Sequence, residues 1–171
     1  EVIFEDTDWL NGRGILTELR ITHIAAAPSF RLLLAAPKKP NAPTFVGLNF
    51  HGNHTYSVDP RVALPPGWVS PKGPGVKNNR AAEIGRGARC TFPLPQIVDR
   101  GYAVATCCHG DFHPNTHELE GIERFLTPAA EADEKTAAGT IALWAWGLMR
   151  CVDYLSGDAR VDNDRIAVVG H

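Results

Sequence analysis

The sequence predicts an α/β fold of three layers, with helices on both faces of a mostly parallel sheet. Two observations lead to this fold class. Three short runs are apolar nearly throughout, as in strands buried on both faces of a parallel sheet: residues 44–50, 102–108 and 165–169. Longer segments separate these runs, and helical character within them suits crossovers between parallel strands. The chain has 171 residues, so we expect residues 1–171 to form one domain or part of one.

Two further strands precede these runs. Residues 14–23 alternate apolar side chains, such as Ile15 and Leu19, with polar ones, which predicts a half-exposed strand. Residues 29–37 are rich in leucine and lie between two prolines, which predicts a second strand, antiparallel to the first.

Two helices complete the predicted elements. Residues 94–100 form a short helix that Gly101 ends as a C-terminal cap. Residues 137–155 are apolar most of the way round a helix, so we expect this helix to be buried on two sides. Trp144 and Trp146 lie two positions apart on it, and core packing is a better interpretation than sugar stacking. Residues 158–164 are expected to form a polar turn before the last strand. The total is about five strands and two helices.

The segments that follow the buried strands hold the candidate site. Ligands of parallel α/β sheets bind beyond the carboxyl ends of the strands. Residues 50–55, 108–115 and 170–171 occupy those ends, and they are rich in histidine, glycine, asparagine and aspartate. The long Pro- and Gly-rich segment 53–80 is expected to lie above them, as a lid or as a fixed wall.

Particular residues in these segments suggest chemical roles. His51, Gly52 and Asn53 follow the third predicted strand, where backbone N–H groups could complete an oxyanion hole; an ordinary turn is the alternative. Asp111 could support a pocket by hydrogen bonds. Trp68 lies in the Pro- and Gly-rich loop, where it could stack on a substrate. Two arginines are interpreted as structural ion-pair partners rather than pocket walls: Arg86 and Arg89.

A metal site is not predicted. Three histidines are spaced four residues apart, with acidic residues nearby, but Gly110 and Pro114 make a helix there unfavourable. A polar loop is the better interpretation of this group: His109, Asp111, His113, His117 and Glu118.

The cysteines leave two interpretations open. None has the spacing of a zinc site. They are either buried free thiols or include one disulfide between distant partners. The four are Cys90, Cys107, Cys108 and Cys151.

The overall charge argues against some partners. The net charge is −2, so a strong electrostatic surface for nucleic acid or anionic membranes is not expected. No apolar run approaches the roughly 20 residues that a membrane helix requires.

The last predicted strand ends in Gly170-His171. A strand followed by Gly-x is the opening of the G-x-S-x-G nucleophile elbow, in which a serine would come directly after His171. His171 itself is then expected to be a packed elbow residue and not the catalytic base. Because an apolar last strand should be central in its sheet, we expect the chain to be the N-terminal portion of a larger domain.

Several segments carry a resemblance to one family. They are VGLNFHGNHT at 46–55, RG at 86–87 with RGYAVAT at 100–106, GTI at 139–141 with WAWGL at 144–148, and RIAVVGH at 165–171. Together they resemble the bacterial glucuronoyl esterases of carbohydrate esterase family 15. The resemblance implies the N-terminal half of a three-layer α/β-hydrolase fold.

The family implies an activity as well. Its members resemble serine esterases that cleave the ester between glucuronic acid on xylan and lignin alcohols. The serine after His171 would attack the ester carbonyl, a downstream histidine and acid would complete the triad, and an arginine would hold the oxyanion. The resemblance implies no cofactor, and export to the periplasm or the medium. The alternatives are an acetyl-xylan-type esterase and a non-catalytic carbohydrate-binding relative without the serine.

Overall fold

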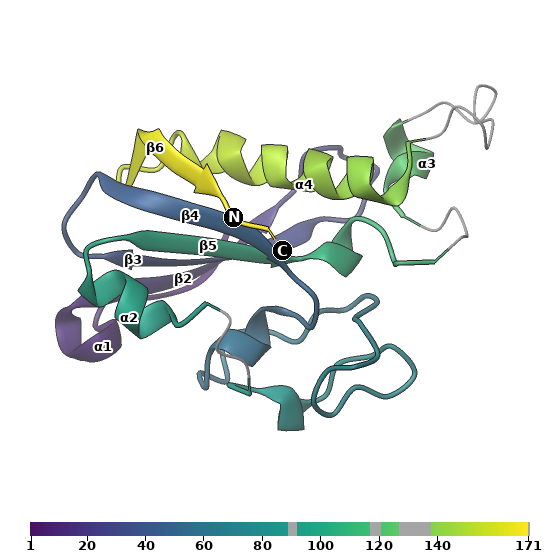
Figure 1. The fold of residues 1–171 in the computed structure, drawn as a ribbon, viewed down its shortest axis with the longest axis horizontal. Helices are drawn as coiled ribbons and strands as arrows, with labels where there is room; N and C mark the ends of the chain where they lie inside the picture. The colour runs from purple at the N-terminus through teal and green to yellow at the C-terminus, as the bar shows by residue number, and fades with distance from the viewer. Residues whose placement is uncertain (89–91, 117–120, 127–137, 171) are drawn as a thin grey trace.

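The computed structural model describes residues 1–88, 92–116, 121–126 and 138–170. These residues form one six-stranded sheet in the order β1-β2-β3-β5-β4-β6 (Figure 1). The strands are β1 (Val2–Asp6), β2 (Gly14–Ile21), β3 (Phe30–Pro37), β4 (Ala42–Asn49), β5 (Ala103–Cys108) and β6 (Val161–Val168).

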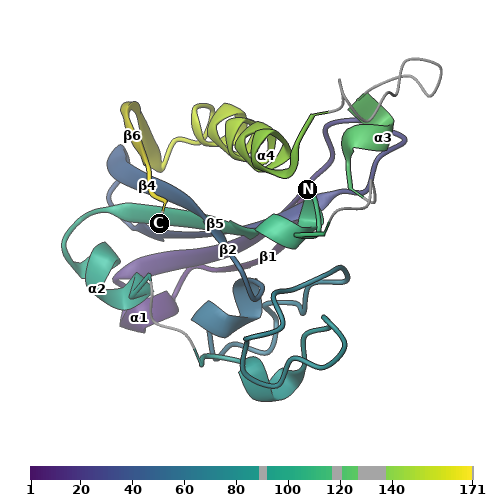
Figure 2. The ribbon, with the colours of Figure 1, turned by 45° about the vertical axis from the view of Figure 1, so that its right-hand side comes forward.

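Helices and loops cover the two faces of the sheet, as the predicted three layers require. Helix α4 (Thr140–Leu155) lies along one face (Figures 1 and 2). The short α1 (Trp9–Gly12), α2 (Leu94–Asp99) and the long loop after β4 lie on the other. The remaining short helices are η1 (Asn53–Tyr56), η2 (Glu83–Gly85), η3 (His109–Asp111) and α3 (Glu123–Leu126). Within the described ranges, no helix has the length and apolar character to cross a membrane.

Two hydrophobic cores lie on opposite faces of the sheet. Side chains alternate along a strand, so Leu32 and Leu34 of β3 join the core under α4, while Leu33 joins the core under α2. Helix α4 contributes one buried stripe at a spacing of four residues: Leu143, Gly147, Cys151 and Leu155.

Helix α4 differs from the prediction in its burial. It is buried along one stripe and not on two sides, because nothing in the described chain covers Ile141 (78 % exposed) or Met149 (56 % exposed). Trp144 and Trp146 pack against the core, as predicted. The predicted helix began at residue 137, which lies outside the described residues. The predicted helix at 94–100 is confirmed as α2, and Gly101 follows it with a φ of +82°.

The N-terminal strands correct one prediction. The antiparallel pairing of β2 with β3 is confirmed, for example by the pair Leu16–Ala35. Strand β2 was predicted to be half-exposed, yet Thr17 and Glu18 are completely buried. The reason is strand β1, which the prediction missed and which pairs with β2 at the edge of the sheet. A five-residue edge strand without alternation carries little sequence signal.

The sheet is mixed rather than mostly parallel. Strand β4 is parallel to β5 and to β6, but β3 is antiparallel to β5 and β2 to β3. The chain reverses direction between β3 and β4, and β5 lies between these two strands. Strand β5 therefore has a parallel neighbour on one side and an antiparallel neighbour on the other.

Strand β6 is longer than predicted, and it lies at the open edge of the sheet. It begins at Val161, so most of the predicted polar turn at 158–164 belongs to the strand. It forms an edge of the described sheet, which agrees with the expectation that this chain leaves an apolar edge unpaired, and Val168 is 62 % exposed. Its apolar side chains therefore have no second neighbouring strand within the described residues.

Candidate functional site

The carboxyl ends of β4 and β5 meet at one edge of the sheet. Asn49 pairs with Cys108, so the segments that follow these two strands leave from the same place. The strand β6 is parallel to β4, with Val168 beside Val46, and it therefore ends at the same edge. Two of the three predicted segments, 50–55 and 108–115, are thus brought together. Gly170 is exposed at the end of the third, and His171 lies outside the described residues.

A glycine allows the end of β6 to approach β4 closely. The N–H of Val169 donates to the carbonyl of Val46 at 2.8 Å. A Cβ atom at Gly47 would lie 2.7 Å from the Val169 carbonyl oxygen and 2.9 Å from the ring of Phe92. Any larger residue at position 47 would therefore displace the end of β6 from the site edge.

Asn49 organises the loop that holds His51, Gly52 and Asn53. Its amide oxygen accepts the N–H of Gly52 at 2.7 Å, and its amide nitrogen donates to Asn53 Oδ1 at 2.8 Å and to Thr106 Oγ1 at 3.1 Å. The N–H of Gly52 is thus bonded within the loop in this structure. Sequence reasoning missed Asn49, although a polar residue near the end of an apolar strand was a usable signal.

The neighbours of this loop explain its residue types. Gly52 has a φ of +98°, and a Cβ atom there would lie 2.5 Å from Pro65, so only glycine fits. Asn53 is buried and donates to the carbonyl of Arg31 at 3.1 Å. His51 is partly buried and packs against Gly73 of the long loop. His51 is the one member of the predicted trio that is not fully buried.

Hydrogen bonds join the long loop to the sheet edge and within itself, which favours a fixed wall over a lid. The N–H of Ser70 donates to the Phe50 carbonyl at 2.9 Å. Asn79 and Val69 bond each other twice, through the Val69 N–H and the Asn79 side chain, at 3.0 Å each.

Arg86 fastens the first part of the same loop. Its Nη1 donates to the carbonyls of Asp59 and Val62, at 2.7 Å each, and its guanidinium pairs with Glu83. The predicted structural role of Arg86 is confirmed by these bonds. Arg89 lies outside the described residues.

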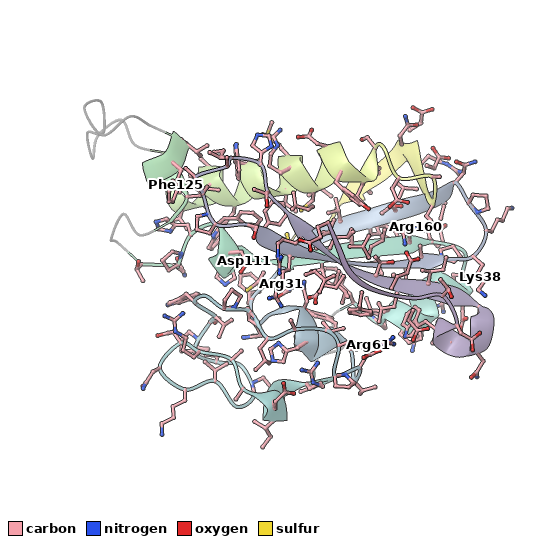
Figure 3. The ribbon with its side chains drawn as sticks, turned by 180° about the vertical axis from the view of Figure 1, so that it is seen from behind. Arg31, Lys38, Arg61, Asp111, Phe125 and Arg160 are labelled. Atoms are coloured by element: carbon pink, nitrogen blue, oxygen red, sulfur yellow. The ribbon has the colours of Figure 1, made fainter. Side chains whose placement is uncertain are left out.

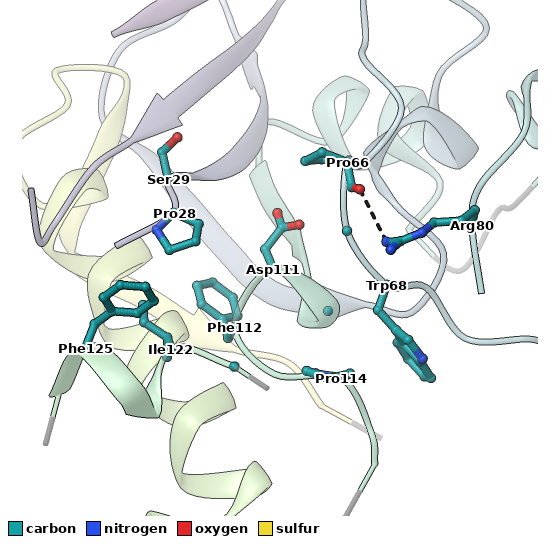
Figure 4. Close-up of a pocket in the computed structure, with 13 residues that line it drawn as sticks. Pro28, Ser29, Pro66, Trp68, Arg80, Asp111, Phe112, Pro114, Ile122 and Phe125 are labelled. Carbon is teal, nitrogen blue, oxygen red and sulfur yellow. Dashed lines mark hydrogen bonds between the residues drawn. The ribbon is translucent and has the colours of Figure 1, made fainter. Parts of the chain in front are cut away.

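A cavity of about 350 Å³ opens beside this wall, and both predicted pocket residues, Trp68 and Asp111, line it. Figure 4 shows Asp111 between an apolar side that includes Phe125 and a side that includes Trp68. Gly110 packs directly on the backbone carbonyl of Trp68, which brings the two sides together. Arg80 also lines the cavity and donates to the Pro66 carbonyl at 3.4 Å.

Asp111 belongs to a buried group of charges behind the cavity. Its Oδ2 accepts the backbone N–H of Arg31 at 3.4 Å, and Figure 3 shows the two residues side by side. Burial raises the pKa of Asp111 to about 7, and the nearby carboxyl of Glu18 adds to this effect. Burial also raises the pKa of Glu18, which accepts the N–H of Ala63 at 3.0 Å. Near pH 7, Asp111 can therefore exist in both protonation states.

His109 is buried, and three aromatic rings surround its imidazole. It is 1 % exposed, and its ring centroid lies 4.9 Å from that of Phe50, 5.3 Å from Trp68 and 4.8 Å from Trp144. Neither ring nitrogen has a hydrogen-bond partner among the described residues. Burial lowers the pKa of His109 to about 4, and the nearby His51 contributes. His109 is therefore neutral at pH 7.

The histidines do not assemble a metal site in the part of the chain that the structure describes. His113 is buried, and its ring lies 3.3 Å from the hydroxyl of Thr140. Its backbone carbonyl accepts the indole N–H of Trp144 at 3.1 Å. These contacts connect the loop to α4. His117 and Glu118 lie outside the described residues.

Known carbohydrate esterases are similar to this chain in sequence and in fold. No protein-family profile matches the chain. A curated carbohydrate esterase, MZ0003 from an unknown prokaryotic organism, is 36 % identical over all of this chain and 42 % of its own length. A promiscuous family 15 esterase from a marine bacterial metagenome superposes with a TM-score of 0.80 at 33 % identity, and a glucuronoyl esterase from Solibacter usitatus with 0.81 at 30 %.

The predicted resemblance to the glucuronoyl esterases of carbohydrate esterase family 15 is confirmed. Both structures cover 100 % of this chain, and the chain covers 45 % of each of them. The chain thus spans less than half the length of the relatives it matches. An acetyl xylan esterase from Paenibacillus sp. R4 shares the fold, with a TM-score of 0.52 at 17 % identity.

The comparisons also confirm the predicted fold class. The mixed six-stranded sheet matches the N-terminal half of the α/β-hydrolase-like fold of family 15. The predicted number of strands is corrected from five to six, because β1 was missed.

Proposed function

We propose that the protein is a serine esterase that cleaves glucuronoyl esters between glucuronoxylan and lignin alcohols. The observation that carries this proposal is the similarity of the whole chain, in sequence and in fold, to family 15 esterases. A resemblance of fold alone would not suffice, since one α/β fold supports many activities. The identity of 30–36 % over all of the chain adds the sequence evidence.

The register of the sheet supports a nucleophile beyond the end of β6. Val168 lies beside Val46 in parallel strands. Strand β6 ends at the same sheet edge as β4, so the residue after His171 would lie close to the loop of His51, Gly52 and Asn53. A serine there would stand where backbone N–H groups of the loop could face the oxyanion of an acyl intermediate. Because Asn49 already holds the Gly52 N–H, an arginine after the serine would supply the main oxyanion contact, as in the family.

The cavity supports the binding of a carbohydrate ester. The indole of Trp68 offers an aromatic face, and the apolar lining includes Phe125. A sugar ring or an aromatic alcohol of the ester would pack on such surfaces, while Arg80 and Asp111 would contact hydroxyl groups. The hydrogen bonds that fix the loop keep this wall in place before substrate arrives, which lowers the entropic cost of binding.

The exposed apolar surface supports a C-terminal half of the same domain as the intramolecular partner of this chain. Strand β6 leaves one edge of the described sheet open, and Val168 and Ile141 are 62 % and 78 % exposed. An open, apolar strand edge favours pairing with another strand. That half would supply the histidine and the acid of the triad. Export to the periplasm or the medium is part of the same proposal, since the proposed polymers lie outside the cell.

The test is hydrolysis by the full-length protein of benzyl glucuronate, with acetylated xylan as the competing substrate. We expect turnover of the glucuronate ester and a loss of at least about a thousandfold in kcat when alanine replaces the residue after His171. Preferred turnover of acetylated xylan would indicate an acetyl-xylan-type esterase instead. Binding of glucuronoxylan without any hydrolysis would indicate a carbohydrate-binding relative.

A further inference from the structure

Two buried thiols face each other where α4 packs on the sheet. Cys107 belongs to β5 and Cys151 to α4, both side chains are completely buried, and their Sγ atoms lie 3.4 Å apart. We propose that Cys107 and Cys151 form a disulfide that fastens α4 to the centre of the sheet. In this structure Cys107, Cys108 and Cys151 are buried free thiols, which is the first of the two interpretations that the sequence left open. The disulfide is therefore proposed as the oxidised form of this pair.

The surrounding structure positions the two sulfur atoms close to each other. Strand β5 is paired on both sides, with β3 and β4, so the backbone of Cys107 is well supported. Cys151 lies in the buried stripe of α4, between Gly147 and Leu155. A disulfide bond is about 2.05 Å long, so the sulfurs need to approach by a little over 1 Å. Small rotations of the two side chains cover such a distance.

The neighbouring cysteine shows that the pairing is specific. Cys108 follows Cys107 on the strand and therefore points to the opposite face of the sheet. There it lines a small cavity with Glu18, Arg31 and Asp111. Cys107 instead shares the core under α4 with Cys151. Cys108 is thus an equally buried thiol, one residue away, that faces a different set of side chains.

The bond requires an oxidant, for which we name a small-molecule disulfide such as glutathione disulfide. The Cys107 thiolate attacks one sulfur of that molecule, so that a mixed disulfide forms and one glutathione thiolate leaves. The Cys151 thiolate then attacks the Cys107 sulfur and releases the second glutathione. Two protein thiols lose two protons and two electrons, and one glutathione disulfide becomes two glutathione thiols.

The burial of the Cys107 thiol determines when the disulfide can form. In the folded protein, the Cys151 hydrogen bond and burial raise the pKa of the Cys107 thiol well above its usual range. Thiolate is therefore scarce once α4 has packed, and exchange proceeds during folding, while both sulfurs are accessible.

The cross-link would also hold one wall of the cavity. The connection between Cys107 and Cys151 includes Asp111 and Phe125, which line the cavity, and His109 behind it. A disulfide closes this long connection and reduces the number of conformations open to the unfolded chain. This proposal rests on the two sulfur atoms alone, so it is independent of the proposed esterase activity.

The test is peptide mapping of the full-length protein after refolding with glutathione and glutathione disulfide. Free thiols are blocked with N-ethylmaleimide in denaturant, and the digest is analysed without reduction. We expect a peptide that links Cys107 to Cys151, lighter than its two reduced components by two hydrogen atoms. Cys108→Ala should keep this link, and Cys151→Ala should abolish it.

The thermal midpoint gives a second readout. Reductant should lower the Tm of the oxidised wild type by several degrees, and it should leave the Tm of Cys107→Ala and Cys151→Ala unchanged. Full modification of both thiols by N-ethylmaleimide after oxidative refolding would overturn the proposal, and so would a link from either one to Cys108 or Cys90. The mapping uses wild-type protein, so the proposal stays testable if an alanine variant fails to fold.

Discussion

Replacing Asp111 with asparagine should stabilise the protein, and the gain should grow as the pH rises. The folded protein holds the pKa of Asp111 at about 7, against an ordinary value of 3.8. Because the folded state favours the protonated acid, ionisation costs stability. The cost is absent below about pH 4, where folded and unfolded states both carry the proton, and it is complete above about pH 7.

The magnitude follows from the two pKa values. Each unit of difference corresponds to about 1.4 kcal/mol, so the full cost is about 4 kcal/mol, of which about 1.6 kcal/mol is already present at pH 5. Asp111→Asn removes the charge with little change of shape, and Glu18 remains beside Arg31. We therefore expect the variant to gain about 2–3 kcal/mol relative to wild type between pH 5 and pH 8. Asp111 has an exposed edge on the cavity, which makes this an upper value.

Urea denaturation of both proteins at intervals from pH 4.5 to pH 8.5 measures the difference. Asp162→Asn is the matched control: a hydrogen bond from Arg165 lowers the pKa of Asp162, so this variant should lose stability at pH 8. A stability difference between wild type and Asp111→Asn that stays constant across the range would refute the reasoning, because it would show that Asp111 does not hold its proton in the folded state.

Three further substitutions test other parts of the structure. Gly147→Ala should cost roughly 1–3 kcal/mol in urea denaturation, because its Cβ would lie 2.5 Å from the ring of Phe112. Gly139→Ala, at the N-cap of the same helix, meets no atom within 4 Å and should cost less. The pKa of His109 is lowered to about 4, so the unfolded state takes up a proton at higher pH than the folded state. The free energy of unfolding of the wild type should therefore fall by about 3 kcal/mol between pH 6.5 and pH 4, and that of His109→Phe should fall by less. Equal losses of the two proteins in acid titrations would contradict this. Trp68→Ala should raise KM for a glucuronate ester about tenfold, equivalent to roughly 1.4 kcal/mol, and Trp68→Phe should restore most of it; an unchanged KM would remove Trp68 from the binding surface.

Local signals predicted most of the elements. The uniformly apolar runs at 44–50 and 102–108 became β4 and β5, since the patterning reports burial on both faces. Gly101 follows α2 with a positive φ, as a glycine cap does. The resemblance to family 15 also came from contiguous segments, and the comparisons confirm it.

Some site residues were predicted and others were missed for a physical reason. Trp68 and Asp111 were identified from their loops, and both line the cavity. Glu18 lies in the strand that was predicted to be half-exposed, and its burial was missed because it depends on β1 and on the long loop that folds over β2. Asn49 was missed because its role depends on partners that only the folded loop brings within reach.

The sequence by itself determined five of the six strands, the helices α2 and α4, the site edge at the ends of the buried strands, and the family resemblance. These features depend on periodicity and on residues close together in the chain. Only the tertiary structure decided that β3 is antiparallel to β5, that Glu18, Arg31 and Asp111 share one buried space, and that Cys107 meets Cys151. Strand order and burial are set by packing between distant segments, and the pKa of Asp111 and the contact of two sulfur atoms follow from that packing.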